Sequence, residues 1–256
     1  MNIDFARKVV IVTGGCQGIG RGIAARFLAE GADVVVTARH PPQEPIASGD
    51  RSAHFIASDV REPDQVAAVV AQTVERFGRI DVLVNNAGGS PPAEAATASP
   101  RFSASIIALN LTAPLVFAQK ANAVMQKQTE GGAIVNIASV SGVRPSPGTA
   151  AYGAAKAGLL SLTQSLAVEW APKVRINAIV AGIIRTEKAH LHYGDEAAMA
   201  RVAATVPLGR MGEPEDIADA CLYLASPLSR YVSGAGLAVH GGGEAPTFLR
   251  AVGPAS

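Results

Sequence analysis

The chain has 256 residues, of which 48% are hydrophobic and 17% charged, and its formal net charge is +1. This composition provides a sizeable core and excludes a disordered chain, while the near-neutral charge favours neither nucleic acid nor an acidic membrane surface as a partner. The start, MNIDFARK, lacks the apolar centre of a signal peptide, and no run approaches about 18 uninterrupted apolar residues. Cys16 and Cys221 are expected to be free thiols, so we predict a soluble, cytoplasmic protein with one domain over residues 1–256.

Short apolar, β-branched runs recur along the chain and predict buried strands. They cover residues 9–12, 34–37, 54–57, 82–84, 134–137, 176–180 and 237–239. Segments with helical spacing separate most of them, as in Val66, Val69, Val70, Val74 and Phe77, which follow Pro63 on one helix face. This alternation predicts an α/β fold: a Rossmann-type, doubly wound domain with a seven-stranded parallel sheet and helices on both faces.

The second crossover departs from that pattern. Pro41, Pro42 and Pro45 lie between the second and third predicted strands. Proline removes a backbone donor and restricts the preceding residue, so a loop is expected there in place of a helix.

A glycine-rich stretch, TGGCQGIG at residues 13–20, joins the first predicted strand to a helical pattern. Glycines allow a tight turn, and a helix N-terminus offers free N–H groups to a pyrophosphate. Such a pattern alone is weak evidence for nucleotide binding, so an ordinary glycine-rich turn is the alternative. About 20 residues further on, where dinucleotide folds read the adenosine ribose, Arg39 follows Ala38. A guanidinium suits a 2′-phosphate and favours NADP(H); the alternative is a solvated arginine at a strand end.

Tyr152 and Lys156 are four residues apart in a helical pattern and share one face. A free phenol has a pKa of about 10, and an ammonium about 5 Å away supplies roughly 3 kcal/mol towards ionising it at an effective dielectric of 20. We therefore expect Lys156 to lower the pKa of Tyr152, although an amphipathic helix edge gives the same spacing. Ser139 ends the fifth predicted strand, and residues 85–88 (NNAG) end the fourth, at the sheet edge where α/β proteins bind ligands.

Taken in order, these motifs resemble the short-chain dehydrogenase/reductase family, in particular its 3-oxoacyl-(acyl carrier protein) reductase-like subgroup, over residues 9–242. The resemblance implies a catalytic tetrad of Asn110, Ser139, Tyr152 and Lys156. It also implies cofactor contacts from Gly14, Cys16, Gln17, Gly18, Ile19, Gly20, Arg39, Asp59, Val60, Asn86, Ala87, Gly88, Tyr152, Lys156, Gly182, Ile184 and Thr186. One departure concerns NADP(H), because Gln17 stands where some NADP-preferring members carry a basic residue.

The resemblance also implies a division of labour within the tetrad. Ser139 orients the substrate oxygen, Tyr152 exchanges its proton, and Lys156 lowers the tyrosine pKa while binding the nicotinamide ribose. Asn110 holds a water that links Lys156 to solvent. The side chains would thus provide general acid/base catalysis and positioning, while the cofactor carries the hydride.

Residues 187–207 are predicted to form a substrate lid. Leu191, Tyr193, Met199 and Val202 either face a bulky substrate or pack against the protein, and the pair His190 and His192 lacks partners for a metal site, so no metal is expected. By family analogy the chain forms a homo-oligomer, a tetramer or dimer, with Phe248 and Leu249 at a subunit contact.

Two classes of function remain: an enzyme acting on a small carbonyl or alcohol, and a dinucleotide-binding regulatory protein without turnover. The intact tetrad favours the enzyme. Within that reading a 3-oxoacyl thioester reductase competes with a hydroxysteroid or other secondary alcohol dehydrogenase, and the near-neutral charge weighs against an acidic carrier protein as partner.

Overall fold

The computed structural model describes residues 3–245 and contains the predicted seven-stranded parallel sheet, with strand order β5-β2-β1-β6-β7-β8-β9. Its strands are β1 (Val9–Thr13), β2 (Asp33–Ala38), β5 (His54–Ala57), β6 (Val82–Asn85), β7 (Gly132–Ser139), β8 (Val174–Ala181) and β9 (Gly236–Val239). Each of the seven contains one of the predicted runs. From β1 the chain builds β2 and β5 on one side and then β6 to β9 on the other. The strand order therefore reverses between β1 and β6, and such a switch point is where these sheets bind ligands.

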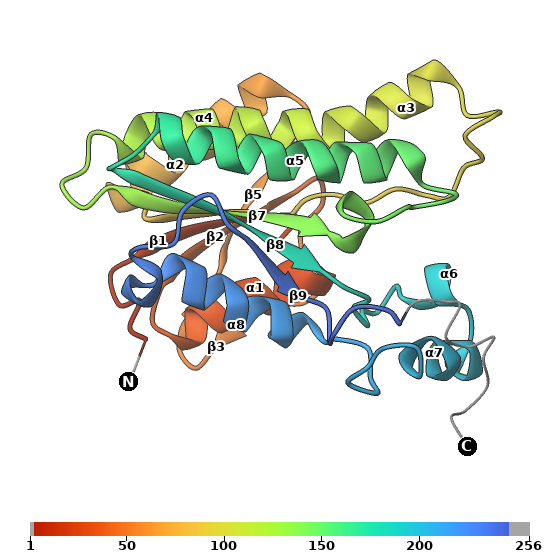
Figure 1. Cartoon of the computed structure of the whole chain (residues 1–256). Helices are drawn as coiled ribbons and strands as arrows, with labels where there is room; N and C mark the ends of the chain where they lie inside the picture. Colours follow the sequence, from red (N-terminus) through yellow and green to blue (C-terminus); the bar gives the residue numbers. More distant parts are fainter. Residues whose placement is uncertain (1–2, 246–256) are drawn as a thin grey trace.

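Helices cover both faces of this sheet, as predicted (Figure 1). Helices α1 (Gly18–Ala29) and α8 (Pro214–Ala225) cover one face, and α2 (Pro63–Phe77), α4 (Ala113–Met125) and α5 (Ala150–Glu169) cover the other, with α3 (Pro100–Ile107) leading into α4 through the π-helical turn η1 (Ala108–Thr112). Two short helices, α6 (His190–Tyr193) and α7 (Glu196–Ala203), lie beyond the ends to which β7 and β8 point. The single-turn 3₁₀ segments are η2 (Val140–Gly142) and η3 (Pro227–Ser229).

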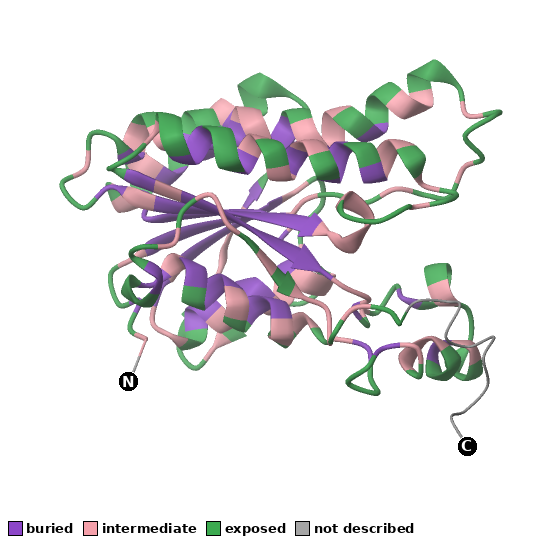
Figure 2. Ribbon diagram, viewed as in Figure 1, coloured by how far each residue is buried: buried purple, intermediate pink, exposed green. Residues whose placement is uncertain are grey.

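The sheet separates two hydrophobic cores (Figure 2). Phe27 and Leu222 are buried between the sheet and the pair α1 and α8, and Phe117 and Leu166 are buried on the opposite face. The strands carry apolar side chains towards both cores, which explains why they are continuous apolar runs and not alternating ones. Because all seven strands are parallel, their carboxyl ends lie at one edge of the sheet.

The segment between β2 and β5 contains no helix, as its prolines predict, but it is more ordered than a plain loop. It forms a two-stranded antiparallel hairpin of β3 (Ala47–Ser48) and β4 (Arg51–Ser52). Ile46 is buried in the α1-side core, and Arg21 of α1 donates to the carbonyls of Glu44 and Pro45. The hairpin is therefore docked on α1, where a crossover helix would otherwise lie.

The continuous helical run Pro100–Met125 is long and apolar enough to cross a membrane by length and composition alone. This differs from the expectation based on uninterrupted apolar residues. In the structure Phe117, Ala121 and Met125 of α4 pack into the core on the sheet. Burial in a core accounts for the apolar composition of this helix as well as a membrane would.

Candidate functional site

A cavity of about 580 Å³ opens at the carboxyl ends of the central strands. It is lined by residues from the glycine loop, from the ends of β2, β6, β7 and β8, from α5 and from the start of the lid. Every predicted site residue lines this cavity except two, Cys16 and Asn110. Cys16 is half-buried and packs against the α1-side core, so its contact with the cofactor stays a prediction.

The glycine loop requires glycine for geometric reasons. Gly14 has a φ of 63°, and a Cβ on Gly20 would lie 2.3 Å from the carbonyl oxygen of Gly14. The turn thus brings the N-terminus of α1 directly against the end of β1. Gln17 precedes the helix and gives no side-chain cap to its first amides.

Thr13, which the sequence analysis did not single out, joins the glycine loop to the central strand. Its hydroxyl accepts hydrogen bonds from the amides of Asn86 and Ala87, both at 2.9 Å. The Asn86 amide group in turn donates to the Thr13 carbonyl at 2.9 Å. A threonine at the end of a strand, immediately before the glycines, was the available signal.

At one end of the cavity lies a set of charged residues from two loops. Arg39 follows β2, and Asp59 follows β5 and holds Arg61 through two hydrogen bonds of 2.9 and 2.5 Å. The Arg61 guanidinium keeps the pKa of Asp59 below its ordinary value. Arg61 was not predicted, and it places a second arginine at this end.

Two buried hydroxyls at the same end point to a polar ligand. Within residues 3–245, the side-chain oxygens of Thr37 and Ser58 are buried and have no hydrogen-bond partner. Both residues line the cavity. A buried polar group without a partner costs free energy, so these hydroxyls fit a ligand with donors and acceptors, such as a ribose or adenine.

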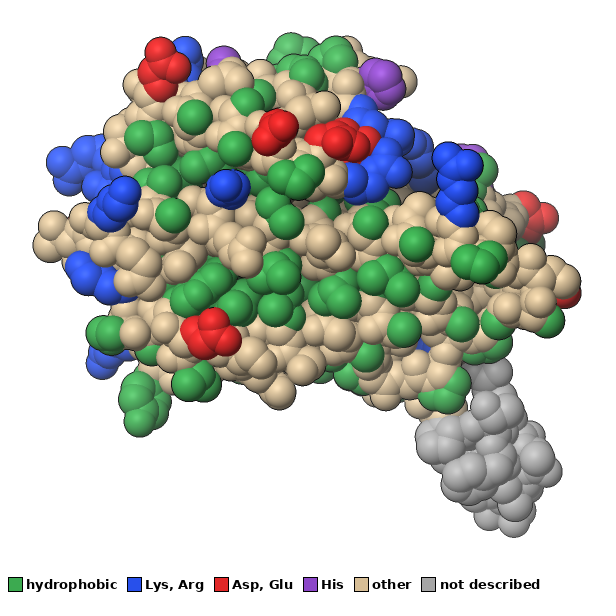
Figure 3. All heavy atoms as spheres, turned by 90° about the horizontal axis from the view of Figure 1, so that it is seen from above, with side chains coloured by type: hydrophobic (Ala, Val, Ile, Leu, Met, Phe, Trp, Pro, Cys, Tyr) green, Lys and Arg blue, Asp and Glu red, His purple; other side chains and the backbone are tan. Residues whose placement is uncertain are grey.

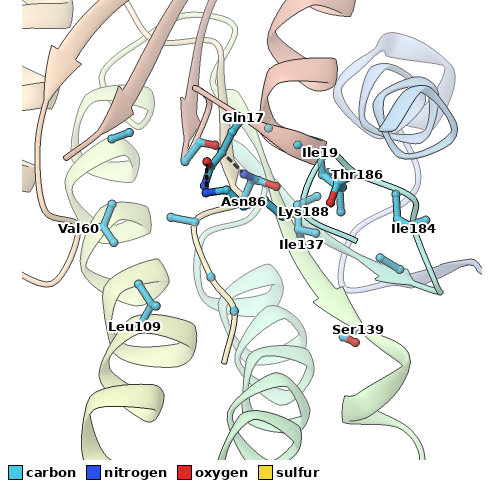
Figure 4. Close-up of a pocket in the computed structure, with 18 of the residues that line it drawn as sticks. Gln17, Ile19, Val60, Asn86, Leu109, Ile137, Ser139, Ile184, Thr186 and Lys188 are labelled. Atoms are coloured by element: carbon cyan, nitrogen blue, oxygen red, sulfur yellow. Dashed lines mark hydrogen bonds between the residues drawn. The ribbon is translucent and has the colours of Figure 1, made fainter. Parts of the chain in front are cut away.

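The opposite end holds three members of the predicted tetrad, and Figure 4 shows Ser139 well separated from Gln17 and Lys188. Tyr152 and Lys156 come from the first turns of α5, with the Lys156 Nζ 5.6 Å from the centre of the Tyr152 ring. Lys156 is only 3% exposed and donates to the carbonyl of Ile137 at 2.7 Å. Ser139 ends β7 and interacts with Tyr152.

Asn110, the fourth member, is fully buried in η1 and does not line the cavity. Its amide oxygen accepts from the Gly89 amide at 2.9 Å, and its nitrogen donates to the carbonyls of Gly89 and Ile106. A Cβ on Gly88 would lie 2.7 Å from this oxygen and 3.3 Å from the Lys156 Nζ. Asn110 therefore clamps the loop after β6 against Lys156, a role that its spacing did not predict.

Burial governs the titration of the two central groups. It lowers the pKa of Lys156 to about 8 and raises the pKa of Tyr152, which the Ser139 hydroxyl partly offsets. The predicted decrease in the pKa of Tyr152 is therefore not found in the protein itself, because desolvation of the phenol is the largest effect. The raised pKa keeps the phenol protonated at neutral pH.

The lid segment divides the predicted apolar set. Met199 is buried against Ala189 and Met211, Leu191 is exposed, and Tyr193 lines the cavity. Val202 is half-buried and does not line the cavity. Two residues that were not predicted, Glu187 and Lys188, also line the cavity and contact the glycine loop.

Comparison with known proteins places this geometry in a family. Residues 14–244 match the family model described as enoyl-(acyl carrier protein) reductase. An L-rhamnose 1-dehydrogenase (NAD(P)(+)) of Azotobacter vinelandii is 37% identical over 92% of this chain and 96% of its own length. A 3alpha-hydroxysteroid dehydrogenase of Mediterraneibacter gnavus is 36% identical over 94% of this chain and 98% of its own.

A solved structure agrees with these relatives. The aldohexose dehydrogenase of Thermoplasma acidophilum superposes with a TM-score of 0.86 at 33% identity, covering 99% of this chain and 97% of that one. Sequence and structure are thus similar along almost the whole chain. The chain belongs to the short-chain dehydrogenase/reductase family and is an NAD(P)-dependent oxidoreductase.

Proposed function

We propose that this protein interconverts a ketone and a secondary alcohol, with Tyr152 as the general acid/base group. The observation that carries the proposal is the convergence of Ser139, Tyr152 and Lys156 at one end of the cavity. A bound nicotinamide supplies or accepts the hydride. Ser139 orients the substrate oxygen, and the neutral Tyr152 phenol donates a proton to that oxygen in the reductive direction.

Lys156 has a positioning and electrostatic role in this proposal. Its hydrogen bond to the Ile137 carbonyl holds the ammonium 5.6 Å from the centre of the Tyr152 ring and beside Gly88. The buried cation stabilises phenolate when Tyr152 has given up its proton, and its remaining N–H groups face the cavity and suit ribose hydroxyls.

We further propose that NADP(H) is preferred over NAD(H). Arg39 is exposed at the end of β2 with a second arginine, Arg61, at the same end of the cavity. Guanidinium groups bind a 2′-phosphate in bidentate fashion and gain little from a bare ribose. Asp59 pairs with Arg61, which offsets the repulsion that its carboxylate would exert on the phosphate.

The proposal is tested with a panel of ketones and alcohols, followed by nicotinamide absorbance with both cofactors. The panel contains 3-oxoacyl thioesters, hydroxysteroids and aldoses, because the relatives are named for steroid and sugar substrates. Turnover of one class with NADP(H) ahead of NAD(H) supports the proposal. Tight cofactor binding without turnover of any member supports the alternative, a dinucleotide-binding regulatory protein.

The protein is also proposed to be a cytoplasmic homo-oligomer. Figure 3 shows hydrophobic side chains gathered on the face formed by α4 and α5, with few charges among them. Along α5 the exposed residues before Glu169 are uncharged, and Val168 is 81% exposed. Such a face suits contact with a second copy, whereas the predicted contact through Phe248 and Leu249 lies outside the described residues. Sedimentation of wild type and Val168→Glu tests it, with the smaller species expected for the variant.

A further inference from the structure

The first residues of the lid line the cavity and contact the glycine loop. A Glu187 carboxylate oxygen accepts a hydrogen bond from the Gly18 amide at 2.8 Å, and the Lys188 ammonium donates to the Gln17 side-chain oxygen at 2.7 Å. Figure 4 shows Gln17, Lys188 and Thr186 together at this end of the cavity. Two adjacent residues of opposite charge thus hold the lid on the loop.

The amide that Glu187 occupies is suited to a ligand anion. Gly18 is the first residue of α1, and the first amides of a helix have no acceptor within the helix and carry its positive partial charge. In a dinucleotide-binding fold these amides face the pyrophosphate. The unpartnered buried hydroxyls of Thr37 and Ser58 in the same cavity independently indicate that a polar ligand belongs there.

We propose that Glu187 competes with the cofactor pyrophosphate for the Gly18 amide, and that Lys188 opposes it by attracting the same pyrophosphate. A carboxylate and a phosphate cannot both accept from one amide, and their negative charges repel each other. The lid therefore weakens cofactor binding through Glu187 and strengthens it through Lys188. This inference rests on the proposed function, since it requires a pyrophosphate-containing cofactor in this cavity.

Lys188 also brings a positive charge to the glycine loop, whose own residue at this point, Gln17, is uncharged. Gln17 stands where a basic residue would assist binding of a phosphorylated cofactor, and Lys188 brings an ammonium to that side chain from the lid. The cation is thus supplied by the lid segment and not by the glycine loop. Cofactor exchange and lid position become linked, because Glu187 must leave the amide before the pyrophosphate reaches it.

The test compares three charge-removing variants of the full chain by fluorescence titration with NADPH and NADH. Glu187→Gln keeps the acceptor oxygen and removes only the charge, so we expect the Kd to fall about fivefold, roughly 1 kcal/mol. Lys188→Gln is expected to raise the Kd by a similar factor. Glu215→Gln is the matched control, because this acid is exposed and lines a second pocket with Glu187 but does not line the cofactor cavity. The Kd of this variant is expected to stay at the wild-type value.

The test depends on the opposite directions in which the two substitutions are expected to change the Kd. A purely structural role in holding the lid would move Glu187→Gln and Lys188→Gln in the same direction, and either that result or an unchanged Kd in Glu187→Gln overturns the proposal. Inorganic pyrophosphate as a competitor of NADPH gives a second readout, with stronger competition expected in Glu187→Gln. If wild-type protein binds neither cofactor, the proposed function itself fails, which is a different result from binding that ignores the charge at position 187.

Discussion

The two ends of the cavity are built differently. At the catalytic end, Ser139, Tyr152 and Lys156 come from a central strand and a long helix, and buried hydrogen bonds such as that of Lys156 to Ile137 hold them. At the other end, Arg39 and Arg61 lie on exposed loops after β2 and β5. The hydrogen-bonded catalytic end, called the rigid end below, is suited to holding one fixed arrangement of side chains. At the exposed end we expect a substitution to change the cofactor preference without disturbing the fold.

The largest effect is expected at the rigid end, from Tyr152→Phe. Removing the hydroxyl removes the proposed proton donor and leaves the ring in place, so kcat should fall about 10³-fold, within the range for a lost general acid. The Kd for the cofactor should stay near the wild-type value, because the exposed end is intact. Steady-state kinetics and a cofactor titration on the same preparation measure both, and a variant that keeps substantial activity would contradict the assignment of Tyr152.

The converse experiment changes the exposed end. Arg39→Asp places a carboxylate where a 2′-phosphate would bind, so the preference should move from NADPH towards NADH by about a hundredfold in the ratio of kcat/KM values. The value of kcat with NADH should change little. Arg101→Asp, at an exposed arginine on α3, is the control for the same change of two charge units away from the cavity. An unchanged preference in Arg39→Asp would contradict the phosphate assignment.

This division also explains what the sequence could predict. The seven strands and the spacing of Ser139, Tyr152 and Lys156 follow from regular periodicity, because strand ends and helix turns fix where those side chains lie. Glu187 and Lys188 were missed because their place depends on partners distant in sequence, such as the Gly18 amide. Arg61 was missed although its partner, Asp59, is only two residues away. The pKa of Tyr152 was predicted in the wrong direction, since spacing indicates a nearby cation and gives no measure of desolvation.

The buried charge at the catalytic end should also reduce stability, in a way that pH reveals. Burial lowers the pKa of Lys156 to about 8, while the unfolded chain titrates near the ordinary value of about 10.4. Between these values the unfolded state binds more protons, so the free energy of unfolding rises with pH; below about pH 8 the penalty is fully present. Lys156→Met lacks this dependence.

We therefore expect wild type to gain about 2 kcal/mol relative to Lys156→Met between pH 7 and pH 10. Urea unfolding of both proteins at several pH values measures this gain, and Lys120→Met, an exposed lysine on α4, should track wild type throughout. A constant difference between wild type and Lys156→Met would show that the lysine is not desolvated in the folded protein.

The smallest expected effect, on the free energy of unfolding, comes from the hydrogen bonds that hold the catalytic helix on the sheet. Asn136 on β7 accepts from the Asn85 amide at 2.9 Å and donates to the Thr163 hydroxyl of α5 at 2.9 Å, which ties the catalytic helix to the sheet. Asn136→Ala should cost about 1.5 kcal/mol, at the low end for a buried network, because Asn85 still donates to Pro114 and Thr163 still donates to Leu159. Urea unfolding of Asn136→Ala, Thr163→Val and the double variant gives the coupling between the two side chains. If kcat falls in Asn136→Ala and the preference for NADPH over NADH stays constant, this network positions the catalytic end alone. A shifted cofactor preference would mean that the two ends of the cavity are not independent.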